Sequence, residues 1–246
     1  MIENFIITSI TTLYTITGSL GLAIIVFTLI VKTLLLPVVL PSLRVGREMK
    51  KIQPELAKLK KKYTDKKELQ KAQVELYQKY NVNPLAGCIP QVIQIGMVIV
   101  LYRALVHFLE NPTVNGVVID TMYYGFDLTL PDTTYVLPVL AALSQLVLSL
   151  MIAPGAEKRD IVPNNSSKKA IQEENKKEEN IAEMAQQMQQ QMMYIMPIMT
   201  GFIATRFPSG LALYWVVSTL YSIVQQYIIA GPGGLTKYLP KGLRRS

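Results

Sequence analysis

Five apolar segments alternate with polar segments along the chain. They cover residues 18–41, 88–108, 136–153, 192–207 and 210–230. A helix needs about 20 mostly apolar residues to cross the hydrocarbon core of a bilayer. The pattern therefore predicts an all-α polytopic membrane protein with five transmembrane helices.

Two shorter features complete this pattern. The segments 192–207 and 210–230 are separated only by Pro208 and Ser209, which predicts a helical hairpin with a tight turn. Residues 2–17 mix Thr and Ser with apolar residues, and we interpret them as an amphipathic helix lying at the membrane interface. A signal peptide is the alternative, but its first part should be positively charged, and this segment contains Glu3 and no Lys or Arg.

Composition excludes several classes of protein. Half of the 246 residues are hydrophobic and 17% are charged, whereas soluble domains usually contain about 25% charged residues. An ordinary soluble enzyme is therefore excluded. Cys88 and His107 are the only residues of their types, which excludes an internal disulfide framework and most His/Cys metal sites.

The charges of the polar segments predict the orientation in the membrane. Segment 44–80 contains 12 Lys and Arg against 5 Asp and Glu, whereas segment 109–135 contains four acids and no Lys or Arg. Cytoplasmic loops carry the excess of basic residues. We therefore expect the N-terminus and 109–135 outside, and 44–80, 154–191 and the basic tail 231–246 in the cytoplasm.

Segment 44–80 has the pattern of a cytoplasmic helical hairpin. Apolar residues recur at helical spacing on both sides of a break near Thr64 and Asp65, and Pro54 is expected near a helix start. Its lysines are candidates for docking anionic partners: Lys50, Lys51, Lys60, Lys61 and Lys62. The alternative is a solvated connector whose lysines only fix the orientation.

The tail offers a second basic cluster. It consists of Lys237, Lys241, Arg244 and Arg245. These residues are candidates for contact with ribosomal RNA, because basic side chains bind phosphate. Ordinary anchoring by positive charge on the cytoplasmic side explains them equally well.

Lys32 is the most unusual residue of the apolar segments. It lies well inside the first one, and the five segments contain no Asp or Glu to pair with it. The missing carboxylates argue against proton-coupled transporters and aspartyl intramembrane proteases, and a lysine at such a depth costs about 2.5–3.5 kcal/mol on insertion scales. The sequence therefore predicts a water-filled cavity around Lys32, open to an anionic visitor. The alternative is a side chain that extends to the inner headgroups.

Neutral polar residues of the other segments are candidates for the rest of the cavity lining. They are Gln91, Gln94, Ser144, Gln145, Tyr214, Trp215 and Ser218. Each of them is equally compatible with a hydrogen bond between helices. Arg103 and Arg206 lie near outer ends of segments, where we expect them to extend to the headgroups.

Four stretches together resemble the YidC/Oxa/Alb family of membrane protein insertases, in its short bacterial form without the large extracytoplasmic domain. The first two are Gly18–Pro37, with Lys32 inside it, and Met49–Pro54. The others are Asn83–Gln94, which reads NPLAGCIPQVIQ, and Phe207–Trp215, which reads FPSGLALYW. Their combination, in this order, is specific to that family.

The resemblance implies five transmembrane helices around a hydrophilic groove open to the cytoplasm. In that family a positive residue of the first span attracts the incoming chain, and Lys32 occupies this position. Gln145 and Trp215 match the polar and aromatic groove positions. Two departures are notable, because bacterial relatives usually have Arg where Lys32 stands and commonly Asn where Ser218 stands.

The expected function is that of an insertase and chaperone for small membrane proteins, without catalysis, cofactor, metal or nucleotide hydrolysis. The expected location is the bacterial plasma membrane. The resemblance implies nascent membrane proteins, the ribosome, the lipid bilayer, the Sec translocon and the signal recognition particle receptor as partners, and no DNA. Two alternatives remain, a structural subunit of a larger membrane assembly and a small-anion transporter.

Overall fold

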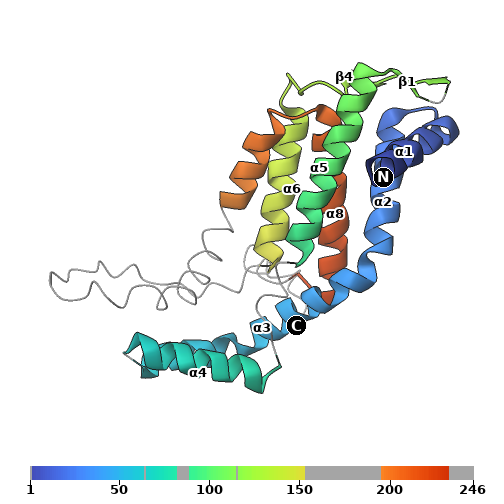
Figure 1. Cartoon of the computed structure of the whole chain (residues 1–246). Coiled ribbons are helices and arrows are strands. Elements are labelled where there is room, and N and C mark those ends of the chain that lie inside the picture. Colours follow the sequence, from blue (N-terminus) through green and yellow to red (C-terminus); the bar gives the residue numbers. More distant parts are fainter. Residues whose placement is uncertain (1, 64, 82–88, 115, 153–194, 233–246) are drawn as a thin grey trace, which may run out of the picture.

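The computed structural model describes residues 2–63, 65–81, 89–114, 116–152 and 195–232. Within these residues the chain is mainly helical, and α2, α5, α6 and α8 form a bundle (Figure 1). The bounds are α2 Leu20–Leu34, α5 Ile89–Glu110, α6 Val136–Ile152 and α8 Ser209–Ala230. A short helix, Ile195–Ala204, packs on α6, where a β-carbon on Gly201 would lie 2.9 Å from Ala142 Cβ.

The described helices differ in whether they are long and apolar enough to cross a bilayer. Among the described helices, α5 is the one that is long and apolar enough to cross as a single unbroken helix. Helices α1 (Ile2–Thr17) and α2 satisfy the same test only as a pair, and they bend by 120° between them. Gly18, with a φ of 68°, ends α1 and permits this bend.

The first predicted span is divided in the structure. The pattern predicts one span over 18–41, but α2 ends at Leu34 and a new helix, α3, runs from Leu36 to Lys62. Pro37 lies in the first turn of α3 and has no N–H to donate to the preceding turn, which explains the break. Helix α3 then turns away from the bundle (Figure 1).

Helices α3 and α4 (Lys66–Lys79) form a hairpin beyond one end of the bundle (Figure 1). Among its described side chains, the buried apolar cluster is small and consists of Ile52, Leu56 and Leu76. The Tyr80 hydroxyl adds a link by donating a hydrogen bond to Glu55. The expectation that Pro54 lies near a helix start is wrong, since α3 begins 18 residues earlier and continues through Pro54.

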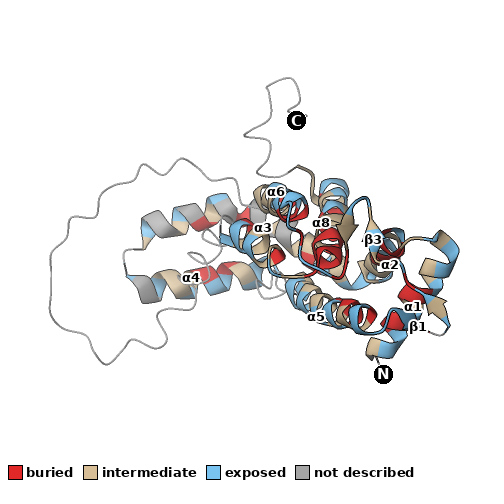
Figure 2. Cartoon of the chain, turned by 90° about the horizontal axis from the view of Figure 1, so that it is seen from above, coloured by how far each residue is buried: buried red, intermediate tan, exposed pale blue. Residues whose placement is uncertain are grey.

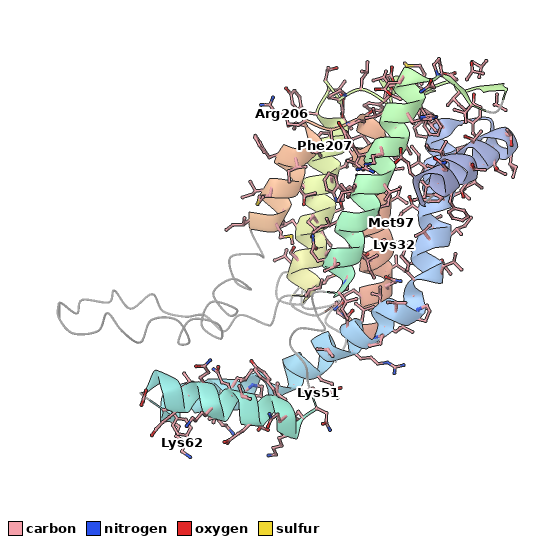
Figure 3. The ribbon with its side chains drawn as sticks, in the orientation of Figure 1. Lys32, Lys51, Lys62, Met97, Arg206 and Phe207 are labelled. Atoms are coloured by element: carbon pink, nitrogen blue, oxygen red, sulfur yellow. The ribbon has the colours of Figure 1, made fainter. Side chains whose placement is uncertain are left out.

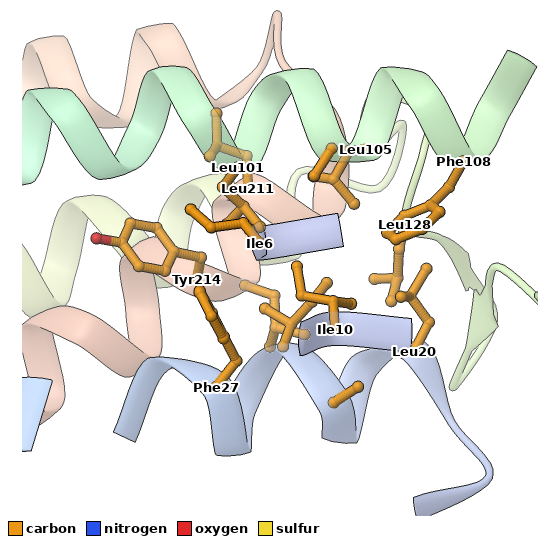
Figure 4. Close-up of a cluster of buried hydrophobic side chains, with 14 of the residues drawn as sticks. Ile6, Ile10, Leu20, Phe27, Leu101, Leu105, Phe108, Leu128, Leu211 and Tyr214 are labelled. Atoms are coloured by element: carbon orange, nitrogen blue, oxygen red, sulfur yellow. The ribbon is translucent and has the colours of Figure 1, made fainter. Parts of the chain in front are cut away.

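Helix α1 fills the space between α2 and α5 at the other end of the bundle. Ile6, Ile7 and Ile10 of α1 are buried in the main core, and Figure 4 shows Ile6 and Ile10 between the ribbons of α5 and α2. In the view from above, buried residues face inward on α1, α2, α5 and α8, and exposed residues lie on the periphery (Figure 2).

The segment between α5 and α6 contains four short strands, which the all-α prediction missed. They are β1 Thr113–Val114, β2 Val117–Val118, β3 Met122–Tyr123 and β4 Phe126–Asp127, paired as two antiparallel hairpins. Each strand has only two residues, too few for an alternating pattern to be visible in the sequence.

Backbone contacts attach this segment to the start of α8. The N–H of Ser209 donates to Leu130 O at 2.7 Å, and the N–H of Gly210 donates to Leu128 O at 2.9 Å. A β-carbon on Gly210 would lie 2.8 Å from Leu128 O, so glycine allows this close approach. The strand segment is therefore attached to the end of the bundle away from the hairpin (Figure 1).

Asp132 caps the start of α6. Its carboxylate accepts hydrogen bonds from the Thr134 N–H at 2.8 Å and the Leu137 N–H at 2.9 Å. Burial alone raises the pKa of this carboxyl, but hydrogen bonds from Thr134, Leu137 and Tyr135 outweigh it and leave the pKa below its ordinary value.

Candidate functional site

A cavity lined by both apolar and polar residues lies in the half of the bundle nearer the hairpin, where Figure 3 labels Lys32 and Met97. Its volume is about 40 Å³, enough for at least one water molecule. Residues of α2, α3, α5 and α8 and the α2–α3 junction line it: Thr28, Val31, Lys32, Leu35, Val39, Pro90, Ile93, Gln94, Met97, Tyr214, Ser222 and Gln225. Four helices thus meet around a single cationic side chain.

Lys32 points its ammonium group into this cavity and binds two other helices there. Its Nζ donates to Gln94 Oε1 of α5 at 3.4 Å and to Ser222 Oγ of α8 at 3.3 Å. An ammonium group has three N–H donors, so one remains for water or for a ligand. The side chain is half-buried, and these two contacts hold its charge inside the bundle.

Gln94 is the common acceptor of the polar cluster. Its Oε1 also accepts hydrogen bonds from Tyr214 Oη at 3.3 Å and from Ser218 Oγ at 3.1 Å. Three donors from α2 and α8 therefore converge on one oxygen of α5. Such bonds between helices are expected where polar groups lie inside a membrane bundle.

Helix α8 presents its polar side chains at helical spacing. Ser218, Ser222 and Gln225 are separated by four and three residues, which places them on one face of a helix. Figure 4 shows Tyr214 one turn earlier, with its hydroxyl pointing away from the apolar cluster. A further polar link between α2 and α8 joins Thr33 Oγ1 and Tyr221 Oη at 2.9 Å.

The electrostatic character of the cavity is positive. None of its lining residues is acidic, and neither of the two ion pairs found among the described residues involves Lys32. The ammonium group is instead solvated by neutral oxygens, which leave its net charge in place. The arrangement suits a ligand that is anionic or rich in hydrogen-bond acceptors.

The structure brings together only some of the residues proposed from the sequence. Gln94 and Ser218 join Lys32 in the cluster described above, together with Tyr214. Gln145 and Trp215 are half-buried and do not line this cavity. Their predicted role in the groove stays a prediction.

Two other candidates lie outside the cluster. Gln91 is exposed and is absent from the cavity lining. Ser144 is buried, but its hydroxyl donates to Ala141 O of its own helix at 3.0 Å. This bond lies within α6, so in the structure Ser144 neither lines the cavity nor makes the bond between helices that the sequence left open.

Three polar lining residues were not recognised from the sequence alone: Ser222, Gln225 and Thr28. Ser222 and Gln225 continue the polar face of Ser218, so the spacing along α8 could have indicated them. Thr28 lies one turn before Lys32, but its hydroxyl donates its hydrogen bond to Ile24 O of the same helix, so this donor is not available to the cavity.

The predicted docking lysines are described only in part. Lys51 is exposed and pairs with Glu48 at 2.7 Å, and Lys62 is exposed with its ammonium 5.2 Å from the ring centre of Tyr63; Figure 3 labels both lysines on the hairpin. The side chains of Lys50, Lys60 and Lys61 lie outside the described residues, as do Lys237, Lys241, Arg244, Arg245 and segment 154–191.

The two outer arginines make contacts that the sequence did not predict. Arg103 lies 3.5 Å from the carboxylate of Glu3, so it joins α5 to the start of α1. The Arg206 guanidinium lies 6.0 Å from the ring centre of Phe202. Both side chains are exposed.

The sequence profile of a family described as "60Kd inner membrane protein" matches residues 12–233. Among known proteins, the chain is 36% identical to the membrane protein insertase YidC of Fusobacterium nucleatum, over 88% of this chain and 88% of that protein. It is 35% identical to the membrane protein insertase MisCA of Bacillus subtilis, over 86% of this chain and 70% of that protein.

The fold is also found among solved structures. A crystal structure of an active YidC insertase with its first transmembrane domain resolved aligns with a TM-score of 0.64 and 23% sequence identity. The alignment covers 92% of this chain and 45% of that one, so this chain spans less than half of that structure.

Proposed function

The chain belongs to the family of 60Kd inner membrane proteins, which includes the YidC insertases, and from this premise we propose that it inserts small membrane proteins into the lipid bilayer. The substrates are nascent chains with one or a few apolar helices and a short translocated segment. The protein acts as an insertase and chaperone, and it uses neither a cofactor nor nucleotide hydrolysis.

The observation that carries this proposal is the Lys32 ammonium group in a cavity between four helices. It contacts neutral oxygens of Gln94 and Ser222, and none of the described residues that line the cavity is acidic. A positive charge in such surroundings attracts acidic and polar parts of an incoming chain. Because the lining comes from four helices, the visitor is received between them and not on the outer surface of one helix.

The membrane arrangement follows from helix lengths and loop charges. We assign five spans: α2 with the start of α3, then α5, α6, the helix Ile195–Ala204 with its flanks, and α8. The acidic segment 109–135 lies outside, and the α3–α4 hairpin and the C-terminus lie in the cytoplasm. The cavity, being nearer the hairpin, then forms the inner part of a groove open to the cytoplasm.

We further propose that the bilayer is thinned locally beside the groove. A hydrocarbon core is about 30 Å thick, and a bilayer thins locally around a short span at modest cost. The translocated segment of a substrate then crosses a shorter apolar distance.

Burial of the substrate helix in lipid drives the reaction. Apolar surface removed from water contributes about 25 cal/mol per Å², so a spanning helix supplies the free energy without nucleotide hydrolysis. The task of this protein is to lower the barrier for the polar segment. The basic hairpin docks the ribosome or anionic partners such as the signal recognition particle receptor, and the Sec translocon cooperates for larger substrates.

A rescue assay tests this function. A bacterium depleted of its own insertase would express the wild-type chain, Lys32→Arg, Lys32→Ala or Lys32→Glu. Insertion of a small single-span substrate would be followed by protease protection. We expect rescue by the wild type and by Lys32→Arg, and loss in Lys32→Glu, because the charge of the groove is then reversed.

Other outcomes would change the assignment. Rescue by all four variants would keep the insertase but overturn the role of the charge. Failure of the wild type, with normal amounts of protein in the membrane, would contradict the insertase function. Stoichiometric purification with a single partner would then favour a structural subunit, and ion flux through liposomes would favour an anion transporter.

A further inference from the structure

The orientation of the Gln94 amide is fixed by its neighbours. Its Oε1 lies 3.4 Å from the Lys32 ammonium, 3.3 Å from the Tyr214 hydroxyl and 3.1 Å from the Ser218 hydroxyl. An amide nitrogen in that place could not accept a bond from the ammonium, which has donors only. The carbonyl oxygen therefore faces the cluster, and Tyr214 and Ser218 of α8 hold it there.

A neutral acceptor has a different effect on Lys32 from that of a carboxylate. The amide dipole solvates the ammonium group but leaves its net charge, whereas a carboxylate at the same distance would form an ion pair and cancel it. Gln and Glu side chains have the same length and branching, so the amide is the feature that keeps the cavity positive. The Ser222 hydroxyl, the second acceptor, is neutral as well.

Gln94 also affects where the lysine side chain lies. A lysine has a long flexible stem and, in a membrane, tends to extend towards the nearest headgroups. Contacts to α5 and α8 instead hold its terminal group between these helices. Without the Gln94 oxygen, only the Ser222 contact would remain of the two that the structure shows.

We propose that Gln94 is a positioning residue, which holds the Lys32 ammonium in the cavity as an unpaired positive charge and thereby sets the preference for substrates with acidic translocated segments. This inference rests on the proposed insertase function. It extends that function by assigning the selectivity for substrate charge not only to the lysine but also to Gln94, a neutral residue of α5 that contacts it.

Gln91 supplies a matched control on the same helix. It lies three residues before Gln94, it is exposed, and it does not line the cavity. The change Gln91→Glu therefore adds the same carboxylate to α5, outside the cluster. Lys32→Gln supplies the second reference, because it removes the positive charge at its source.

The test uses the purified full chain in proteoliposomes and two single-span substrates. One substrate carries Asp residues in its translocated segment, and the other carries Asn at the same positions. Insertion is measured by protease protection. We expect Gln94→Glu to lower insertion of the acidic substrate about tenfold, corresponding to about 1.4 kcal/mol, and to match Lys32→Gln. Insertion of the Asn substrate should stay near the wild-type level, and Gln91→Glu should change neither.

A second variant separates the position of the lysine from its charge. Gln94→Met removes the acceptor at similar volume and adds no charge. We expect its loss to be confined to the acidic substrate and smaller than the loss in Gln94→Glu.

Three results would contradict either the role of Gln94 or the insertase function itself. Equal behaviour of Gln94→Glu and Gln91→Glu would overturn the role of Gln94. Loss of both substrates in Gln94→Glu and Gln94→Met would overturn it too, since Gln94 would then only hold the bundle together. If the wild-type chain inserted neither substrate, the insertase function itself would fail.

Discussion

The ring of Tyr123 lies against the backbone of Gly21 so closely that a β-carbon on residue 21 would overlap it. Tyr123 belongs to β3, in the segment between α5 and α6, and Gly21 belongs to the first turn of α2. This contact attaches the strand segment to the outer end of α2, as the bonds to Ser209 and Gly210 attach it to α8.

Gly21→Ala should therefore destabilise the protein. The added methyl group must displace the Tyr123 ring, and overpacking of this kind typically costs about 1–3 kcal/mol. Thermal unfolding of the purified protein in detergent would measure the effect. Gly96→Ala is the matched control, because a β-carbon there would meet nothing within 4 Å; it should be neutral or stabilise by up to about 1 kcal/mol. Equal melting temperatures for the two variants would contradict the packing argument.

Helix α1 should be held in place by its apolar face and only weakly by its ion pair. Ile10 is completely buried, and truncating such a residue to Ala costs about 2–5 kcal/mol. Glu3 and Arg103 are 3.5 Å apart but exposed, and exposed pairs contribute about 0–1 kcal/mol. We expect Ile10→Ala to lower the unfolding temperature clearly and Glu3→Gln to leave it nearly unchanged. A larger effect of Glu3→Gln would show that the ion pair dominates.

Much of the helical framework could be predicted from the sequence, because long apolar runs and a basic hairpin leave strong local patterns. The break at Leu35 was missed because the apolar run continues across it. Pro37 causes the break through its missing backbone N–H, which leaves no trace in the hydrophobic pattern. The short strands were missed because the strand segment is held in place by contacts with α2 and α8, two helices that are distant from it in the sequence.

The candidate site was predictable only in outline. Lys32 was evident, because a charge within an apolar run is conspicuous in any sequence. The choice among its polar neighbours was not, since it depends on how α5 and α8 are rotated about their axes. Gln91 and Gln94 look alike in the sequence, yet one is exposed and the other accepts three hydrogen bonds.

The Asp132 cap should make stability depend on acid pH. Its pKa is below the ordinary value of 3.8 in the folded protein, so its stabilisation is complete above pH 5 or so and disappears as the pH falls through the folded pKa. At neutral pH, Asp132→Asn should cost about 1–3 kcal/mol, because the amide cannot replace all bonds to the carboxylate. Melting curves in detergent between neutral and acid pH should converge for wild type and variant. Exposed Glu110→Gln serves as control, and curves that stayed parallel would contradict this role.

The α3–α4 hairpin should unfold independently of the bundle. Among the described side chains of the hairpin, the buried apolar ones are Ile52, Leu56 and Leu76, and so small a core cannot accommodate an unpaired charge. We expect Ile52→Asp to make the hairpin sensitive to limited proteolysis, because an unpaired buried carboxylate must reach water, while the melting temperature of the bundle stays the same. Val74→Asp, at an exposed position of α4, should leave protease resistance unchanged. If Ile52→Asp lowered the melting temperature of the whole protein, the hairpin and the bundle would form one cooperative unit. If insertion survived in Ile52→Asp, the folded hairpin would be dispensable for docking and the basic residues of the segment would act as an unstructured chain.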